Sequence, residues 1–209
     1  MSRALIAVII LAGILAGGVA AHFVRRAGDG GLPLERAVLF QERRPLPDAA
    51  LTRAGGARFG ATSLAGHWTF LFFGFVNCPD ICPTTLATLA TVEKSLGDLP
   101  PAERPAVAFV SVDPARDTPE ILARYVAHFD PAFEGVTGSA AAIEAWARSL
   151  GVAVIIGPPA ADGSYSVDHS AAIFLVDPES RVAALFGTPH EAGAIARDFR
   201  RILAARQAG

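Results

Sequence analysis

The amino-acid sequence predicts an α/β sandwich with a mixed central sheet, preceded by one N-terminal transmembrane helix. Apolar runs typical of buried strands alternate along the chain with stretches in which apolar residues recur at helical spacing. The last two runs flank a short turn, as in an antiparallel hairpin, and a long uncharged stretch precedes all of these elements. Because helices cover the faces of such a sheet, the body of the chain is expected to be layered.

The composition indicates one folded domain with a tail. The chain has 209 residues, of which 52% are hydrophobic and 18% are charged. This balance is too apolar for a disordered protein, and the length excludes a chain of two enzymes. With 18 basic and 20 acidic residues the net charge is -2, so a surface that binds nucleic acid is not expected.

The N-terminal segment 4–24 is predicted to be a transmembrane anchor. As a helix it would be about 31 Å long, enough to cross a bilayer. A cleavable signal peptide is the competing interpretation, since Arg3 precedes the apolar run and Gly18–Ala20 resembles a cleavage site. Arg25 and Arg26 would by themselves favour a cytoplasmic body under the positive-inside rule.

A linker at 25–48 and a domain at 49–206 are expected to follow. The linker prediction depends on the flexible Gly28–Gly31 stretch and on several prolines. Within the domain, the Gly55-Gly56 pair indicates a short hairpin. His67–Phe75 is an apolar, aromatic run, which predicts a central strand buried on both faces.

The middle of the domain is predicted to continue the alternation of helix and strand. Leucine and valine residues at helical spacing predict a helix that ends at Gly97, and Ala106–Val112 is typical of a second buried strand. Asp117 is the expected N-cap of a helix at Thr118–Phe129.

The C-terminal third is predicted to end in a hairpin and a helix. Ser139 is expected to open a helix that ends before Gly151. The final helix is expected to begin at Thr188-Pro189. Three further strands are expected at Val152–Ile156, Ala171–Val176 and Arg181–Phe186. This order of elements is thioredoxin-like.

The two cysteines, Cys78 and Cys82, lie between a predicted strand and a predicted helix, where open α/β sheets place their binding crevices. Pro83 favours a helix with Cys82 as its cap, and the helix terminus should then lower the pKa of the Cys82 thiol. The spacing allows one metal ion or one disulfide and differs from the Cys-x-x-Cys of dithiol oxidoreductases. Two buried apolar cysteines, or a purely structural disulfide, are further alternatives.

A third ligand would distinguish a metal site from a disulfide. His169, in the sequence Asp168-His169-Ser170, immediately precedes a predicted strand. The other four histidines have no motif around them. On its own such a histidine is more often an ordinary surface or core residue.

Three motifs in order along the chain resemble those of the Sco (SenC) family of copper proteins. The resemblance covers residues 50–205 and depends on three segments: CPDICP at 78–83 after Gly74-Phe75, VSVDPARDTP at 110–119, and VDHS at 167–170 followed by LVDP at 175–178. It implies a thioredoxin-like domain that is held by an N-terminal helix on the outer, periplasmic side of the bacterial plasma membrane.

The resemblance implies that Cys78, Cys82 and His169 are copper ligands, and that the two cysteines can also form a redox-active disulfide. Two thiolates and an imidazole suit Cu(I) and, with a carboxylate or water, Cu(II). Structural zinc fits less well because it normally takes four protein ligands.

Three aspartates are candidates for a supporting role around the metal. Asp113 is expected at the end of a central strand near the thiols, where it could orient a ligand or accept a proton, and Asp80 and Asp168 are similar candidates. In the alternative interpretation, Asp117 caps a helix and Arg116 pairs with a nearby carboxylate.

The function expected from this resemblance is that of a copper metallochaperone for the binuclear copper site of cytochrome c oxidase. Its expected partners are the copper-receiving oxidase subunit and a periplasmic copper donor. The alternative is a thiol-disulfide reductase that acts on cysteines of the oxidase subunit. A peroxiredoxin-like peroxidase is disfavoured, because Val76 and Asn77 occupy the places where it would need a threonine.

Overall fold

The computed structural model describes residues 32–47 and 49–208. The chain divides into two units, Met1–Pro33 and Leu34–Gly209, and the elements below belong to the second. The predicted anchor at 4–24 lies outside the described residues. Within the described ranges, none of the helices has the length and apolar character that a membrane crossing requires.

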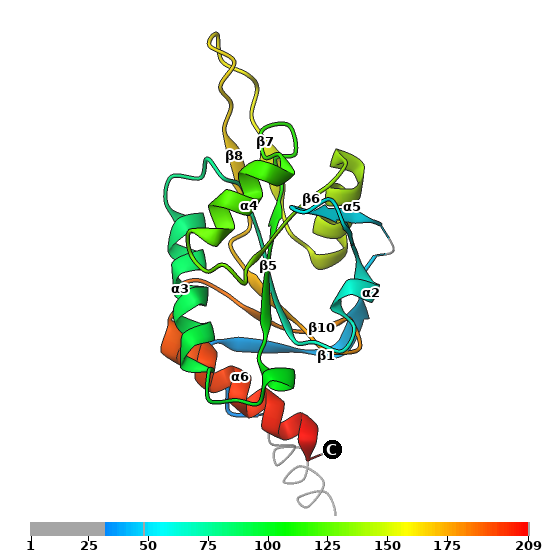
Figure 1. Cartoon of the computed structure of the whole chain (residues 1–209), viewed down its shortest axis with the longest axis vertical. Helices are drawn as coiled ribbons and strands as arrows, with labels where there is room; N and C mark the ends of the chain where they lie inside the picture. The colour runs from blue at the N-terminus through cyan, green and yellow to red at the C-terminus, as the bar shows by residue number, and fades with distance from the viewer. Residues whose placement is uncertain (1–31, 48, 209) are drawn as a thin grey trace, which may run out of the picture. The chain divides into compact units, whose positions relative to one another are not determined.

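Within the described residues, eight strands form one mixed sheet (Figure 1), in the spatial order β1-β10-β9-β4-β5-β6-β2-β3. β4, β5 and β6 run parallel, and the other neighbouring pairs are antiparallel. The predicted mixed sheet is therefore confirmed. Its strands are β1 (Ala37–Pro45), β2 (Leu51–Arg53), β3 (Arg58–Phe59), β4 (Thr69–Gly74), β5 (Ala106–Ser111), β6 (Glu134–Thr137), β9 (Ile173–Val176) and β10 (Arg181–Phe186).

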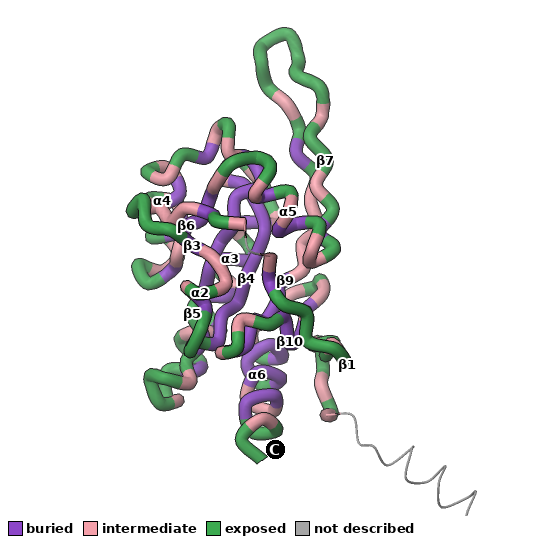
Figure 2. The backbone as a smooth tube through the Cα atoms, turned by 90° about the vertical axis from the view of Figure 1, so that its right-hand side faces the viewer, coloured by how far each residue is buried: buried purple, intermediate pink, exposed green. Residues whose placement is uncertain are grey.

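β4 is the central strand, and all six of its residues are buried. Successive side chains of a strand point to opposite faces, so an uncharged run can bury both. On one face Phe70 packs against Phe199, with ring centroids 5.7 Å apart. On the other face Phe73 meets Phe174 edge-on at 6.3 Å. Figure 2 shows the buried residues concentrated along this part of the sheet.

Helices cover the sheet, and α3 and α6 pack against each other. The cap of α5 agrees with the sequence: the Ser139 side chain accepts a hydrogen bond from the amide of Ala142, and Gly151 ends the helix with a left-handed φ of 71°. The helices are α2 (Ala61–Leu64), α3 (Ile81–Ser95), α4 (Pro119–Ala127), α5 (Ala140–Leu150) and α6 (Ala192–Gln207), with a 3-10 turn at Pro101–Glu103.

The predicted starts of α4 and α6 were wrong. Thr118, not Asp117, is the N-cap of α4, and its side chain accepts from the amide of Ile121. Asp117 is instead buried, and its carboxylate accepts hydrogen bonds from the amide of Val76 and the hydroxyl of Ser111. The last helix begins at Ala192, after Glu191, rather than at Thr188-Pro189.

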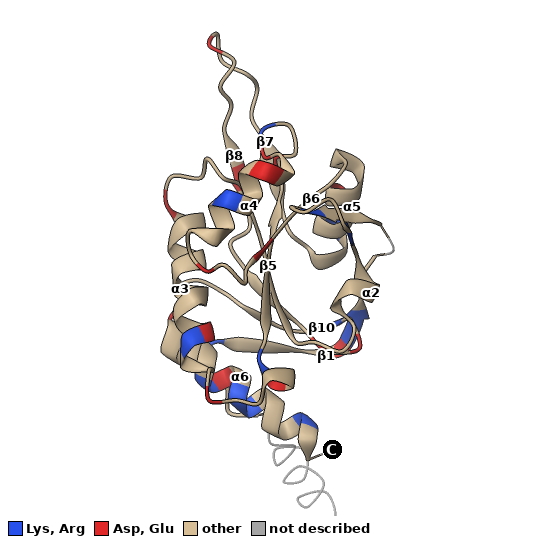
Figure 3. Ribbon diagram, in the orientation of Figure 1, with Lys and Arg blue, Asp and Glu red and all other residues tan. Residues whose placement is uncertain are grey.

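The predicted linker at 25–48 was also wrong in part, because residues 37–45 form β1 and pair with β10 at the edge of the sheet. Most of this strand is exposed, so its sequence lacks the apolar alternation that would have identified it. The buried carboxylate of Asp198 in α6 accepts hydrogen bonds from the amides of Glu35, Arg36 and Ala37 at 2.7–3.0 Å. Figure 3 shows acidic and basic residues interspersed along α6.

We predict that Asp198→Asn destabilises the fold by about 1–3 kcal/mol, because an amide N–H would then face backbone donors in a buried site. Urea unfolding of the full-length chain measures this. The control is Asp98→Asn, which removes an exposed ion pair with Arg200 and should cost no more than about 1 kcal/mol. Equal losses in the two variants would show that Asp198 does not anchor β1.

Candidate metal centre

The strand directions bring three distant segments to one edge of the sheet. β4 and β5 are parallel, so the loops that follow them emerge at the same edge. β9 is antiparallel to β4 and pairs Ile173 with Phe72, so the segment that enters β9 comes from that edge too. The cysteine segment follows β4, and His169 lies four residues before Ile173.

The cysteines lie where the chain passes from β4 into α3. α3 begins at Ile81 with Asp80 as its N-cap, so Cys82 is the second helical residue and not the predicted cap. Pro83 is tolerated in the third position, because first-turn amides have no acceptor within the helix. Cys82 is fully buried, whereas Cys78, in the preceding loop, is only half-buried.

Gly74, the last residue of β4, makes room for the buried thiol. A Cβ at this position would lie 2.7 Å from Cys82 Sγ and 2.6 Å from an edge carbon of the Phe109 ring. Real Cβ atoms do not approach other atoms so closely, so a larger residue would displace the sulfur or the ring. The close approach of Cys82 and Phe109 therefore explains why position 74 is a glycine, a steric constraint that the sequence alone did not reveal.

His169 reaches the cysteines from a separate hairpin. It is the last residue of β8 (Val167–His169), which pairs with β7 (Val154–Ile156) in a two-stranded sheet. Its Nε2 lies 3.3 Å from Cys82 Sγ. The Phe72 and Phe75 rings meet the imidazole at steep angles, with centroids 6.1 and 5.8 Å away.

The hydrogen bond on the other ring nitrogen fixes the tautomer of His169. Nδ1 lies 3.0 Å from the carbonyl oxygen of Ser170, which can only accept, so Nδ1–H is the donor. Burial lowers the pKa of the imidazole, which favours the neutral ring. The lone pair of Nε2 then faces the thiol, as a metal ligand requires.

Cys78, Cys82 and His169 together form a compact donor cluster. Their sulfur and nitrogen atoms all lie within 4.8 Å of one another. A protein metal–sulfur bond is about 2.3 Å, so small shifts would bring all three to one ion. Two thiolates and an imidazole favour a soft ion such as Cu(I), and in the described part of the chain no fourth side chain joins them to complete a structural zinc site. Both thiols are free.

The expected lowering of the pKa of Cys82 by the helix terminus was wrong for the metal-free protein. Burial raises the pKa of this thiol well above its ordinary value. The cause is the loss of hydration around a fully buried sulfur, which disfavours the thiolate more than the hydrogen bond from the backbone of Phe75 favours it.

The three aspartates proposed as supporting residues have different positions. Asp80 and Asp168 are exposed, and Asp80 makes no side-chain hydrogen bond as the N-cap of α3. Asp113 is buried and accepts from the Tyr165 hydroxyl at 2.6 Å and from the Arg116 guanidinium. Across residues 32–47 and 49–208, none of the three belongs to the donor cluster itself.

Sequence reasoning missed the roles of Asp117 and Tyr165. The Asp117 carboxylate accepts from the Ser111 hydroxyl at 2.6 Å and from the amide of Val76 at 3.0 Å, which ties the cysteine loop to the loop after β5. The sequence did offer one signal for Tyr165: it is the only aromatic residue in the polar and glycine-rich segment 157–166, which marks it as a residue that could pack against the rest of the domain.

The comparison with protein families decides the identity of this chain. Residues 47–204, most of the chain, match the family model described as SCO1/SenC. The chain belongs to the SCO1/SenC family. The resemblance stated from the three motifs is therefore confirmed.

Individual Sco proteins are similar over the same region. The human mitochondrial protein SCO2 homolog is 38% identical over 155 residues, which are 74% of this chain and 58% of the relative. The chain spans about half the length of the curated mitochondrial relatives that it matches.

Solved Sco structures agree with the fold. The Arabidopsis thaliana ScoI structure, with copper bound, has a TM-score of 0.70 at 34% identity and covers 76% of this chain and 98% of its own. Bradyrhizobium japonicum ScoI, also with copper bound, has a TM-score of 0.67 at 35% identity, with coverages of 75% and 98%. The predicted mixed α/β, thioredoxin-like fold is thus confirmed.

We predict that the two thiols of this Sco protein differ strongly in reactivity. In the reduced, metal-free chain, iodoacetamide should alkylate Cys78 at least about tenfold faster than Cys82, because Cys82 is buried and its raised pKa keeps it protonated. The Cys82 rate should rise as pH increases, since thiolate forms only as the raised pKa is approached. Mass spectrometry of peptides gives both rates, and equal rates at neutral pH would contradict this account of the site.

Proposed function

We propose that this protein is a copper metallochaperone that binds one copper ion through Cys78, Cys82 and His169. The observation that carries the proposal is the convergence of two thiols and an oriented imidazole nitrogen within 4.8 Å. The two solved Sco structures with copper bound support the same metal. A soft donor set of this kind prefers Cu(I) over the hard cations.

Copper transfer would proceed by ligand exchange, and the burial of the two sulfurs suggests an order. Cys78 is half-buried at the surface of the site, so an incoming ligand from a partner would replace it first. Cys82, fully buried beneath it, would release the ion last and take up a proton as it does so. The raised pKa of Cys82 in the metal-free site favours that final reprotonation.

The proposed recipient is the copper-receiving subunit of cytochrome c oxidase, with a periplasmic protein as copper donor. Membership of the Sco family supports this assignment. We further propose that residues 4–24 anchor the chain in the bacterial plasma membrane, with the domain on the periplasmic side. The uncharged character of that segment supports the anchor.

A thiol-disulfide reductase that acts on the oxidase subunit is the second candidate. The observation in its favour is that both thiols are free and lie within 4.8 Å of each other where the chain enters α3, so one could attack a disulfide and the other resolve it. Because the two roles use the same sulfurs, formation of the disulfide would expel copper.

We predict that the reduced full-length protein binds one Cu(I) per chain and that the disulfide form binds almost none, because oxidation removes two of the three ligands. Metal analysis after anaerobic loading and desalting measures both forms. Equal loading of the two forms would overturn the assignment of the cysteines as ligands.

We predict that His169→Ala weakens Cu(I) binding by more than the roughly 10- to 100-fold that loss of an outer-shell partner costs, while largely sparing disulfide exchange. Competition with a chelator gives the affinity, and reduction of a disulfide peptide gives the exchange rate. His128→Ala, an exposed histidine at the end of α4, is the matched control and should change neither. If oxidase assembly in cells survives His169→Ala, the reductase is favoured.

A further inference from the structure

The hairpin that carries His169 is only loosely packed on the rest of the domain. Among the described residues, β7 and β8 pair with each other and with none of the strands of the main sheet. Ile155 and Ile156 of β7 are 63% and 55% exposed. Figures 1 and 2 show this β7–β8 hairpin and its connecting loop extending away from the sheet.

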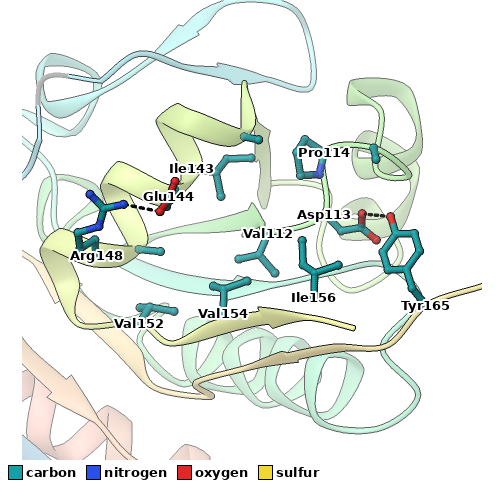
Figure 4. Close-up of a pocket in the computed structure, with 13 residues that line it drawn as sticks. Val112, Asp113, Pro114, Ile143, Glu144, Arg148, Val152, Val154, Ile156 and Tyr165 are labelled. Atoms are coloured by element: carbon teal, nitrogen blue, oxygen red, sulfur yellow. Dashed lines mark hydrogen bonds and ion pairs between the residues drawn. The ribbon is translucent and has the colours of Figure 1, made fainter. Parts of the chain in front are cut away.

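A cavity of about 630 Å³ separates the inner side of the hairpin from α5. Figure 4 shows Val154 and Ile156 of the hairpin on one side of the cavity and Ile143 of α5 on the other. Apolar packing across this gap is therefore weak, since side chains separated by a void lose their dispersion contacts. Apart from the Phe72 and Phe75 rings around the imidazole of His169, other contacts must hold the hairpin in place.

Arg116 and Asp113, in the loop after β5, supply these contacts through Tyr165 in the hairpin. The Tyr165 hydroxyl donates to Asp113 Oδ1 at 2.6 Å, and Arg116 Nε donates to the other carboxylate oxygen. Arg116 Nη1 donates to the backbone carbonyl of Tyr165 at 3.3 Å. The guanidinium also stacks 3.7 Å from the centre of the Tyr165 ring, a close cation–π contact.

The Asp113–Arg116–Tyr165 cluster is also fastened to the segment that carries the cysteines. The Ser111 hydroxyl accepts a hydrogen bond from the amide of Asp113 at 3.0 Å and donates one to the carboxylate of Asp117. The same carboxylate accepts a hydrogen bond from the amide of Val76. Val76 lies two residues before Cys78. One polar network therefore connects the hairpin that carries His169 to the loop that carries Cys78.

We propose that the Asp113–Arg116–Tyr165 cluster positions the β7–β8 hairpin so that Nε2 of His169 faces the thiol of Cys82. Tyr165 is four residues before His169, about 13 Å along an extended chain. Arg116 and Asp113 hold both the side chain and the backbone carbonyl of Tyr165. These contacts oppose rotation or sliding of the segment that leads into β8, which would move His169 away from Cys82. Arg116 is suited to this task because its planar fork can make two directed hydrogen bonds and stack at the same time.

The significance of this arrangement for copper depends on the proposed function, but the arrangement itself can be tested without metal. Arg116→Lys keeps the charge and loses both the fork and the stacking surface, and Tyr165→Phe removes only the hydroxyl. Arg148→Lys is the matched control, because Arg148 lines the same cavity but pairs with Glu144 within α5. All variants are made in the full-length chain.

The first measurements use the reduced, metal-free protein. We expect hydrogen exchange at the hairpin amides to accelerate about tenfold or more in Arg116→Lys, less in Tyr165→Phe, and not at all in Arg148→Lys. We also expect the imidazole NMR signals of His169 to move toward those of a solvent-exposed ring in the first two variants. Unchanged exchange and unchanged signals in Arg116→Lys would overturn the proposal, and Tyr165→Phe decides the matter if the arginine variant does not fold.

The second measurement is Cu(I) affinity in a double-mutant cycle with His169→Ala. Arg116→Lys should weaken binding about 10- to 100-fold in the wild-type background and have almost no further effect once His169 is absent. An equal loss in both backgrounds would mean that Arg116 does not act through His169, which overturns the proposal. If the wild-type protein binds no copper, the proposed function fails, and the metal-free measurements alone decide the role of the cluster.

Discussion

The site depends on the direction in which β9 runs beside β4. Because the two strands are antiparallel and pair Phe72 with Ile173, the chain that enters β9 arrives at the edge where the chain leaves β4. Cys82 lies in the first turn of α3, a helix that packs against α6, and Cys78 lies in the loop that precedes this helix. His169 is mounted on a hairpin outside the main sheet. One ligand therefore belongs to a different element from the other two, and its position depends on the contacts that hold that hairpin.

Burial gives the metal-free site its chemical character. It raises the pKa of Cys82 and lowers that of His169, so both groups are favoured in their neutral forms at neutral pH. A neutral site can remain largely free of water without the cost of an unpaired buried charge. In the proposed chaperone, copper entry displaces protons from the thiols and copper release returns them, so delivery is coupled to proton uptake as well as to the partner's ligands.

The parts of the fold that could be predicted were those with strong local patterns. The aromatic run that forms β4, the capped helix α5 and the hairpin of β9 and β10 were all identified, because burial leaves a local pattern in the sequence: a continuous apolar run in β4 and a helical spacing of apolar residues in α5. β1 was mistaken for linker, since an exposed edge strand carries no such period. The cap assigned to Asp117 was wrong because Asp117 and Thr118 both suit the N-cap position. Only the hydrogen bonds that Asp117 accepts from the Ser111 hydroxyl and the Val76 amide distinguish the two residues.

The sequence predicted the donor set in two steps: it contains only two cysteines, four residues apart, and the resemblance to the Sco family selected His169 from the five histidines. It also determined the family, through three ordered motifs. The tertiary structure decided how these residues meet: which imidazole nitrogen faces the thiol, which sulfur is buried, and how Tyr165 and Arg116 hold the hairpin. These features depend on contacts between segments separated by dozens of residues, and local sequence patterns carry no information about the direction or distance of such contacts.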